Sequence, residues 1–364
     1  MTAANLNTKV GAASRPTSVD QKGFREFAWP PVWTVALARL LPYFLPSPES
    51  TSMLRITLPL LVALLAAMTA VPAAAFDGIR VTLLGTGGPW PSVERFGPST
   101  LVEAGDQVLL FDCGRGVAQR LAQAGVALKD VDAVFLTHLH SDRTVGLPDL
   151  WLTGWLRGRP DPLLVFGPDG TQDMMRHFEQ AFRADIASHV DLPHEAAAIA
   201  AHDIGENVVY STDDVTVTAF VVDHGSIAPA YGYRIDYQGR RAVVLSGDTR
   251  YSDNLIRVAR GVQLLVHEVA AADPDLASTS ERVRSIIGIH TTPEDAARVF
   301  RQTRPYLAIY APILLFDVNE DALMRRTHAL YPGAVQVGRD LMVIEIQNEL
   351  QVRNGPSEER RLRD

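Results

Sequence analysis

The sequence predicts an α/β fold in which two sheets face each other and carry helices on their outer faces. Short β-branched runs alternate with amphipathic helical stretches from Gly78 onward, and this alternation is typical of a layered α/β protein. The composition, with 47% hydrophobic and 21% charged residues, is that of a globular chain. Because no Pro/Gly-rich linker interrupts the region after Phe76, we expect a single domain there.

Each run along this region predicts one element. In the first half we expect strands at 79–84, 108–111, 133–136 and 163–166, and helices at 117–124 and near 172–182. In the second half we expect strands at 215–222, 231–237, 241–245, 264–266, 307–310 and 341–346. Helices are expected there at 293–303 and near 320–331.

A long uncharged run lies before this region. Residues 56–76 carry no charged side chain, follow Arg55 and end in small residues, which is the layout of a secretory signal. A run of this length can also span a membrane. Pro59, Pro72 and the small-residue end favour a cleaved signal. We therefore expect an exported protein, periplasmic or secreted, that is membrane-anchored if the signal stays uncleaved.

These features divide the chain. We expect translation to begin at Met53, which makes residues 1–52 an extension of doubtful status and 53–75 the signal peptide. The main domain is expected at 76–347. Residues 348–364 alternate charges and are expected to form a flexible, solvated tail.

Charge and cysteine content exclude some functions. The chain has 34 Lys and Arg against 42 Asp and Glu, a formal net charge of −8. Because so acidic a chain has no sequence-wide basic surface for a polyanion, we expect no nucleic-acid partner. Cys113 is the only cysteine, which excludes an intrachain disulfide and a zinc ribbon. Any metal must therefore be held by His, Asp or Glu.

The strongest chemical signal is the segment VFLTHLHSDRTVGLPD at 134–149. A buried strand stops there before a loop that carries His138, His140 and Asp142. In an extended segment residues i and i+2 point the same way, so both histidines can reach one ion with the carboxylate on the same side. Zinc accepts imidazole nitrogen and carboxylate oxygen. The alternative is a pair of surface histidines beside a polar turn, which the acidic third member disfavours.

With further motifs, this segment resembles the metallo-β-lactamase superfamily, in the branch that holds ribonuclease Z and arylsulfatase-like hydrolases. The resembling segments, in the order of that branch, are LLGTGGPWP at 83–91, LLFDCGRG at 109–116, THLHSDRTVGLPDLW at 137–151, VDHGSIAPAYGYRI at 222–235, LSGDTR at 245–250, LLVHE at 264–268 and IHTTPEDAARVF at 289–300. The resemblance covers 78–346. It implies an αββα sandwich of two facing mixed sheets, with a metal site at one edge between them.

The resemblance also implies metal ligands. His138, His140 and His224 match the three histidines of one zinc site, and Asp248 matches the carboxylate that bridges two metals. Asp142 matches a ligand of the second zinc. In the family that second zinc also takes the histidine directly after this aspartate and a histidine after a late strand.

Both of those histidines are missing here. Arg143 follows Asp142, and Ala311-Pro312 stand where the late histidine is expected. Neither arginine nor proline can be a ligand, so we expect one Zn²⁺ at a mononuclear site. We hypothesise that Arg143 occupies the vacated position and pairs with Asp142 and Asp248. The alternative is that Arg143 points to solvent and the second site is merely eroded.

Catalytic roles follow from the same resemblance. Asp142, freed from a metal, is placed to orient or deprotonate a water, and His290 matches the family histidine that donates a proton to the leaving group. Arg143 is a candidate for binding an anionic substrate oxygen. His267 and Glu268 are candidates for orienting ligand histidines, and a satisfied core histidine is the alternative for His267.

From these residues we expect a metal-dependent hydrolase of a small anionic ester, such as a phosphodiester or an aryl sulfate, weakened by the loss of the two-metal clamp. The alternative is a catalytically silent metal- or anion-binding protein on the same fold. tRNA 3′ processing ranks lower, because ribonuclease Z enzymes of this type carry a long tRNA-binding arm and only residues 236–245 lie in its place. The sequence leaves the oligomeric state open.

Overall fold

Two facing sheets build the protein, which the computed structural model describes over residues 76–355. The predicted extension and signal peptide at 1–75, and the end of the predicted tail at 356–364, lie outside the described residues. Within the described part, no helix is both long and apolar enough to cross a bilayer.

Among the described residues, the first sheet has eight strands in the order β15-β14-β1-β2-β3-β4-β5-β6. Their bounds are β1 Ile79–Gly85, β2 Ser99–Ala104, β3 Gln107–Phe111, β4 Ala133–Phe135, β5 Leu163–Gly167, β6 Ile199–Asp203, β14 Met342–Ile346 and β15 Leu350–Asn354. Pairing is antiparallel from β15 to β3 and parallel from β3 to β6, so the sheet is mixed.

The second sheet has seven strands within the same described range, in the order β13-β12-β11-β10-β9-β8-β7. Their bounds are β7 Asn207–Ser211, β8 Val215–His224, β9 Ile227–Tyr237, β10 Arg241–Leu245, β11 Leu264–Ala272, β12 Leu307–Phe316 and β13 Val335–Val337. Strands β7 to β10 are antiparallel, and β10 to β13 are parallel. The sequence expectation of two mixed sheets is therefore confirmed.

Alternating side chains join the sheets to each other and to the helices. Leu109 and Phe111 of β3 face the inner core, whereas Leu110 between them faces the outer helices. Val243 and Val244 of β10 divide in the same way. This period of two is what a strand buried on both faces requires.

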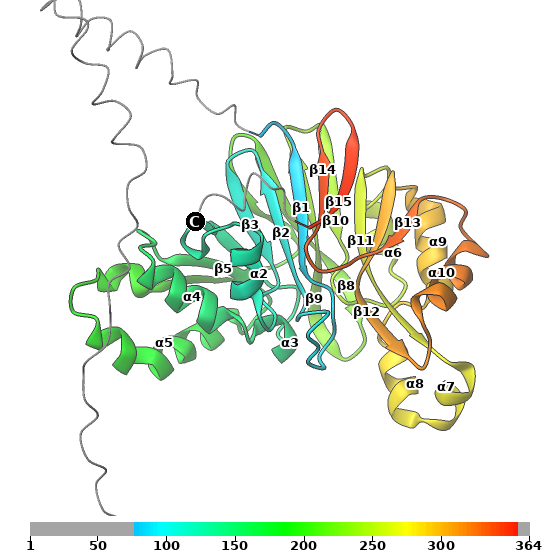
Figure 1. Cartoon of the computed structure of the whole chain (residues 1–364), viewed down its shortest axis with the longest axis horizontal. Helices are drawn as coiled ribbons and strands as arrows, with labels where there is room; N and C mark the ends of the chain where they lie inside the picture. The colour runs from blue at the N-terminus through cyan, green and yellow to red at the C-terminus, as the bar shows by residue number, and fades with distance from the viewer. Residues whose placement is uncertain (1–75, 356–364) are drawn as a thin grey trace, which may run out of the picture. The chain divides into compact units, whose positions relative to one another are not determined.

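Helices cover both outer faces, as the αββα prediction expects (Figure 1). The first sheet is covered by α2 Val117–Gln123, α4 Leu147–Leu156 and α5 Thr171–Ser188. The second is covered by α6 Asp253–Val258, α9 Pro293–Thr303 and α10 Glu320–His328. The remaining helices are α3 Ser141–Thr144, α7 Pro274–Thr279 and α8 Glu281–Ile287, with short 3₁₀ turns at Leu128–Asp130 and His194–Ala197.

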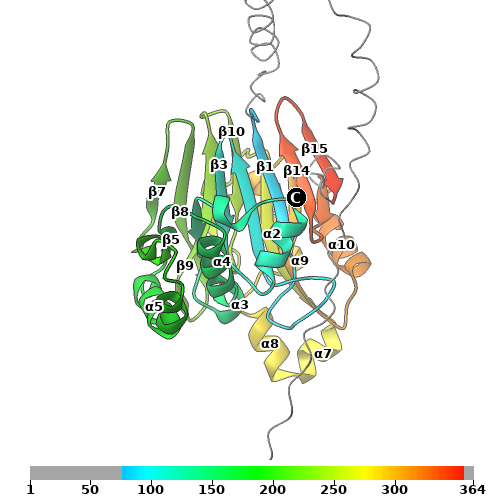
Figure 2. The same cartoon turned by 60° about the vertical axis from the view of Figure 1, so that its left-hand side comes forward.

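One end of the sandwich gathers the short helices. In both views α3, α7 and α8 lie at the same end of the sheets (Figure 1 and Figure 2). The segment after β4 leads into α3, and β8 stops at His224. The predicted ligands therefore stand on loops and strand ends, where function is positioned by a rigid scaffold.

Strand β12 and the start of the predicted tail are two of the segments that differ from expectation. β12 continues through Ala311 and Pro312 to Phe316, because its pairing with β11 resumes after an interruption opposite Glu268. A proline is tolerated there since it removes a hydrogen bond where the ladder is already broken. The predicted tail also begins with β15, whose Arg353 pairs with Glu345 on the neighbouring strand. Its charges lie on a half-exposed edge strand, which explains why the sequence resembles a solvated tail.

Candidate metal centre and active site

Three histidines from distant segments meet at this end of the sandwich. Nε2 of His138 lies 3.0 Å from Nδ1 of His140, the residue directly before α3. The ring of His224, at the end of β8, is 5.0 Å from the His138 ring and 5.5 Å from the His140 ring. One nitrogen of each lies within 4.8 Å of the others. The structure therefore brings the three predicted histidines together.

Hydrogen bonds to Nδ1 of His138 and of His224 set the tautomers of these two rings. Thr137 Oγ1 lies 3.0 Å from both oxygens of the Asp112 carboxylate and 3.0 Å from Nδ1 of His138. Because the hydroxyl donates to the carboxylate, its oxygen accepts Nδ1–H, which leaves Nε2 of His138 with a lone pair facing the cluster. Nδ1 of His224 likewise donates to the carbonyl of Ile289 at 2.9 Å.

These histidines suit a metal ion. Nε2 of His224 is buried and has no hydrogen-bond partner among the described residues, so a buried nitrogen lone pair is left unsatisfied in the cluster. Burial lowers the pKa of both His138 and His224, which keeps the imidazoles neutral. A neutral imidazole is the form that binds metals.

Asp248 supplies the fourth donor. It follows β10 in a turn, its side chain is 6% exposed, and Oδ2 lies 3.8 Å from Nε2 of His138 and 4.0 Å from Nε2 of His224. Three nitrogens and one carboxylate oxygen are a donor set that zinc accepts. The residues predicted for the first metal site thus converge. Their role as ligands stays a prediction.

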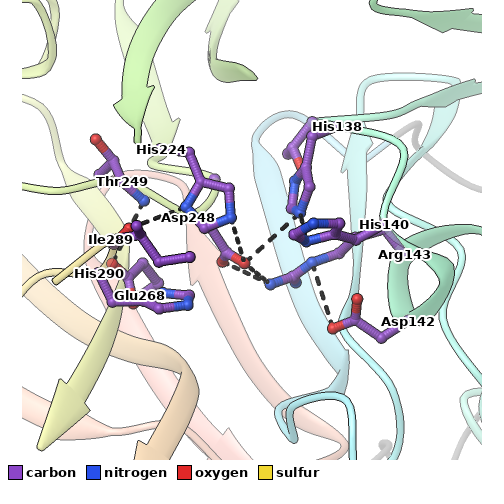
Figure 3. A network of polar contacts seen from close by, with 12 residues as sticks. His138, His140, Asp142, Arg143, His224, Asp248, Thr249, Glu268, Ile289 and His290 are labelled. Atoms are coloured by element: carbon purple, nitrogen blue, oxygen red, sulfur yellow. Dashed lines mark hydrogen bonds and ion pairs between the residues drawn. The ribbon is translucent and has the colours of Figure 1, made fainter. Parts of the chain in front are cut away.

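Arg143 lies beside this cluster, inside the protein rather than in solvent. Its Nη2 donates to both oxygens of Asp248 at 2.5 Å each (Figure 3). Nε lies 3.8 Å from Asp142, and Nη1 lies 3.6 Å from Asp112. The side chain is only 4% exposed. The guanidinium therefore occupies the place among the carboxylates that the sequence hypothesis gave it.

Electrostatics keep this guanidinium charged. Burial acts to lower the pKa of Arg143, but the carboxylates of Asp248, Asp142 and Asp112 outweigh it and raise that pKa above its ordinary value. Burial acts to raise the pKa of Asp248, and Arg143 and the neighbouring imidazoles hold it well below its usual range. The pair is thus an arginine cation and a carboxylate anion.

His290 and Glu268 form a second pair next to the cluster. Nδ1 of His290 lies 3.1 Å from Oε2 of Glu268, whose Oε1 accepts the backbone N–H of Thr291 at 2.7 Å. Burial acts to lower the pKa of His290, but Glu268 outweighs it and raises the pKa to about 9. His290 is therefore protonated at neutral pH in the metal-free protein, which suits a proton donor. A ligand nitrogen of His290 also lies within 4.8 Å of donor atoms of His224 and Asp248.

The structure separates the two residues predicted to orient histidines. Glu268 contacts His290, the predicted proton donor, rather than one of the predicted ligand histidines. His267 is buried on the other face of β11, where its ring packs against Phe300 at 5.7 Å between centroids. The alternative of a core histidine therefore holds for His267.

Asp112 is the site residue that sequence reasoning missed. It follows β3 with a left-handed φ of 57° and accepts the backbone N–H of Thr137 at 2.9 Å. Burial raises its pKa to about 7, against the opposing effect of Arg143. The available signal was an acidic residue directly after a buried strand, within the motif LLFDCGRG.

A cleft of about 360 Å³ opens onto these groups. Asp142, Arg143, Asp248 and His290 line it together with Pro312. Pro312 therefore lines the same cleft as Arg143 and Asp248, and in the family resemblance its segment is where the missing histidine is expected. With arginine and proline at these positions, both histidines that the family uses for the second metal are absent.

Comparisons with known proteins agree with this architecture. A family described as "Beta-lactamase superfamily domain" matches residues 107–311, more than half of the chain. A protein named ribonuclease Z from Mycobacterium marinum is 37% identical over 278 residues, which cover 74% of this chain and 99% of that protein.

Two solved structures share the fold. The metallo-β-lactamase fold protein YhfI from Bacillus subtilis superposes with a TM-score of 0.58 at 21% identity, covering 74% of this chain and 100% of its own. Human tRNase Z, short form, superposes with a TM-score of 0.56 at 22% identity, covering 73% of this chain and 98% of its own.

These comparisons overturn two sequence expectations. The expectation that a small anionic ester is preferred over RNA is wrong, because the relatives carry the name of a ribonuclease. The expectation of no nucleic-acid partner is wrong for the same reason. The M. marinum relative is matched over 99% of its length, so the short connection between β9 and β10 does not separate this chain from it. The net charge of the whole chain is a poor guide to nucleic-acid binding, because only charges within roughly 10 Å act strongly on a ligand.

The broader expectations, of a metal-binding fold and of a hydrolase, hold. The fold implies metal binding, and the relatives' name is that of an enzyme, which favours a hydrolase over the catalytically silent alternative. The chain therefore belongs to the β-lactamase superfamily and, within it, to the hydrolases related to ribonuclease Z.

Proposed function

We propose that this protein is a ribonuclease that hydrolyses RNA phosphodiester bonds with one zinc ion and with Arg143 in place of a second metal. The observation that carries the proposal is the pairing of Arg143 with both oxygens of Asp248, in a chain 37% identical to a protein named ribonuclease Z. A guanidinium is always charged, so it provides at this position the positive charge that a second cation would provide.

His138, His140, His224 and Asp248 would hold the zinc ion. When bound, zinc lowers the pKa of a water toward ~7 and polarises a phosphoryl oxygen. Asp142 lies on the same cleft, 3.8 Å from Arg143 and without a hydrogen bond to it. Its carboxylate is therefore available to orient the attacking water and to accept its proton.

Arg143 has donors that no described residue accepts. Its Nε is buried with no hydrogen-bond partner among the described residues, and its Nη1 is 3.6 Å from Asp112, beyond a normal hydrogen bond. The planar fork of a guanidinium matches two oxygens of a phosphate. We assign Arg143 to binding a non-bridging phosphoryl oxygen, which stabilises the charge that develops there.

His290 serves the leaving group. Its raised pKa keeps it protonated at neutral pH, and it lines the cleft with Asp142 and Arg143. A protonated imidazole donates its proton to the departing ribose oxygen, and Glu268 holds the ring in place through Nδ1.

The test is cleavage of RNA by the full chain with zinc supplied. A precursor tRNA and a single-stranded RNA serve as substrates. We expect cleavage that falls at least about 100-fold in His138→Ala, since even changes around metal ligands cost 10- to 100-fold. His177→Ala is the matched control, because His177 is exposed on α5 away from the cluster. A folded, zinc-loaded protein that cleaves neither RNA would contradict the proposal.

A further inference from the structure

The cleft has lining residues that the proposed hydrolysis does not use. Besides the charged groups Asp142, Arg143 and His290, it is lined by the apolar residues Pro89, Trp90, Ile286 and Leu314. A ligand that fills the cleft must therefore combine anionic oxygens with a flat or apolar part.

Trp90 is the prominent apolar residue of this cleft. It is 47% exposed, whereas Trp151 and Trp155 are each 1% exposed. Its ring meets Phe316 edge-on, with centroids 5.7 Å apart and planes at 87°. This contact uses an edge-to-face geometry and fixes the orientation of the indole.

The loop that carries Trp90 is tied down at both ends. Gly87 N–H donates to the carbonyl of Phe96 at 2.9 Å. The Asp340 carboxylate accepts the backbone N–H groups of Thr86 and Phe96 at 2.9 and 2.7 Å. Trp90 therefore stands on a pre-organised loop, so that little conformational entropy is lost when it binds a ligand.

Arg282 adds a free cation to the same cleft. It is exposed on α8, lines the cleft, and makes no ion pair with any described residue. A cation without a carboxylate partner, on the same cleft as an exposed aromatic ring, is complementary to a phosphate that is linked to a planar ring.

We propose that Trp90 and Arg282 form a nucleotide subsite next to the scissile bond. Trp90 stacks on a nucleobase, and Arg282 contacts the neighbouring phosphate. The inference rests on the proposed function for its substrate class and specifies how that substrate is held. Stacking is tolerant of base identity because every base has a π face, so the subsite binds purines and pyrimidines alike.

Nucleotide binding tests the subsite without turnover. We use adenosine 5′-monophosphate and ribose 5-phosphate as probes, with the full chain and zinc, in calorimetric titrations. We expect the nucleotide to bind about 5- to 100-fold more tightly than the base-free probe, which is the range of one base stack. This preference should vanish in Trp90→Ala and persist in Trp90→Phe. Equal binding of both probes by the wild type, or a preference that survives in Trp90→Ala, overturns the proposal.

Two control variants sharpen the result. Val93→Ala is the control for Trp90. It changes a 90% exposed residue of the same loop that does not line the cleft, and it should leave the preference for the nucleotide intact.

Arg282→Ala should weaken the binding of both probes about equally and reduce the salt dependence of that binding. Arg284→Ala, on the same helix but off the cleft, is its control and should do neither. Unchanged phosphate binding in Arg282→Ala overturns its part of the subsite.

The outcome is separable from that of the proposed function. If RNA is not cleaved but the Trp90-dependent preference is found, the hydrolysis fails and the subsite stands. If RNA is cleaved and the preference is independent of Trp90, the subsite fails alone. An RNA with one abasic site on either side of the cleaved bond then shows which nucleotide Trp90 holds.

Discussion

Arg143 donates from a single nitrogen, Nη2, to both carboxylate oxygens of Asp248. Oδ2 of the same carboxylate faces Nε2 of His138 and of His224. Asp248 thus lies between a histidine cluster and a guanidinium. In the family this carboxylate bridges two metals. Under the proposed function, Arg143 provides the charge of one of those two cations, and several consequences can be measured.

The first measurable consequence is the metal content of the protein. Four convergent donors at one site, and a guanidinium in place of the other, lead us to expect close to one zinc per chain after dialysis. His224→Ala should bring the content near zero, because it removes a donor that has no other partner. Inductively coupled plasma mass spectrometry measures the zinc content of the purified wild type and of His224→Ala. Close to two tightly bound zinc ions per chain would refute the single-site arrangement.

Stability should depend on Arg143. Arg143→Gln removes the cation and leaves Asp112, Asp142 and Asp248 as buried carboxylates. Breaking a buried pair in this way costs about 3–5 kcal/mol of unfolding free energy. Urea denaturation of the metal-free protein measures the loss.

Arg157→Gln is the control for this experiment, since Arg157 is exposed just after α4. It should change the unfolding free energy by less than about 0.5 kcal/mol. Equal stability of Arg143→Gln and the wild type would mean that the guanidinium does not compensate the three carboxylates.

A second metal site should be restorable. The double variant Arg143→His and Pro312→His places imidazoles at the two positions where the family has ligands, beside Asp142 and Asp248 on the cleft. We expect the metal content to rise from about one toward two ions per chain. If the content stays at that of the wild type, Pro312 does not occupy the ligand position.

The His290–Glu268 pair predicts a pH dependence of stability. The pKa of His290 is raised from 6.5 to about 9 by Glu268, in spite of its burial. A histidine with a raised pKa contributes stability that is fully present below pH 6.5 and is lost as the pH rises to 9. The unfolding free energy of the metal-free wild type should therefore fall across this window.

Glu268→Gln isolates that contribution, because it removes the charge that raises the pKa of His290. The variant should show a smaller fall between pH 6.5 and 9, with urea denaturation at a series of pH values as the measurement. Parallel curves for the two proteins would show that the pair is not charged as the structure indicates.

Local pattern was enough for much of the fold. The strand at Arg241–Leu245 and the helix at Pro293–Thr303 have the bounds that the sequence predicts, because each buries a regular apolar face. The strands β2, β6, β7, β13 and β15 were missed. β6, β7 and β15 are half-exposed edge strands, so the alternation of apolar and polar residues that marks a strand is weak in them.

The sequence by itself determined which residues are candidates for binding a metal, since the spacing of His138 and His140 along an extended segment makes their side chains point the same way. It could not determine the direction of the Arg143 side chain, the contacts of Asp112, or the placement of Trp90 and Arg282 on one cleft. Those relationships join loops from different strands, and only the packing of the two sheets brings those loops together.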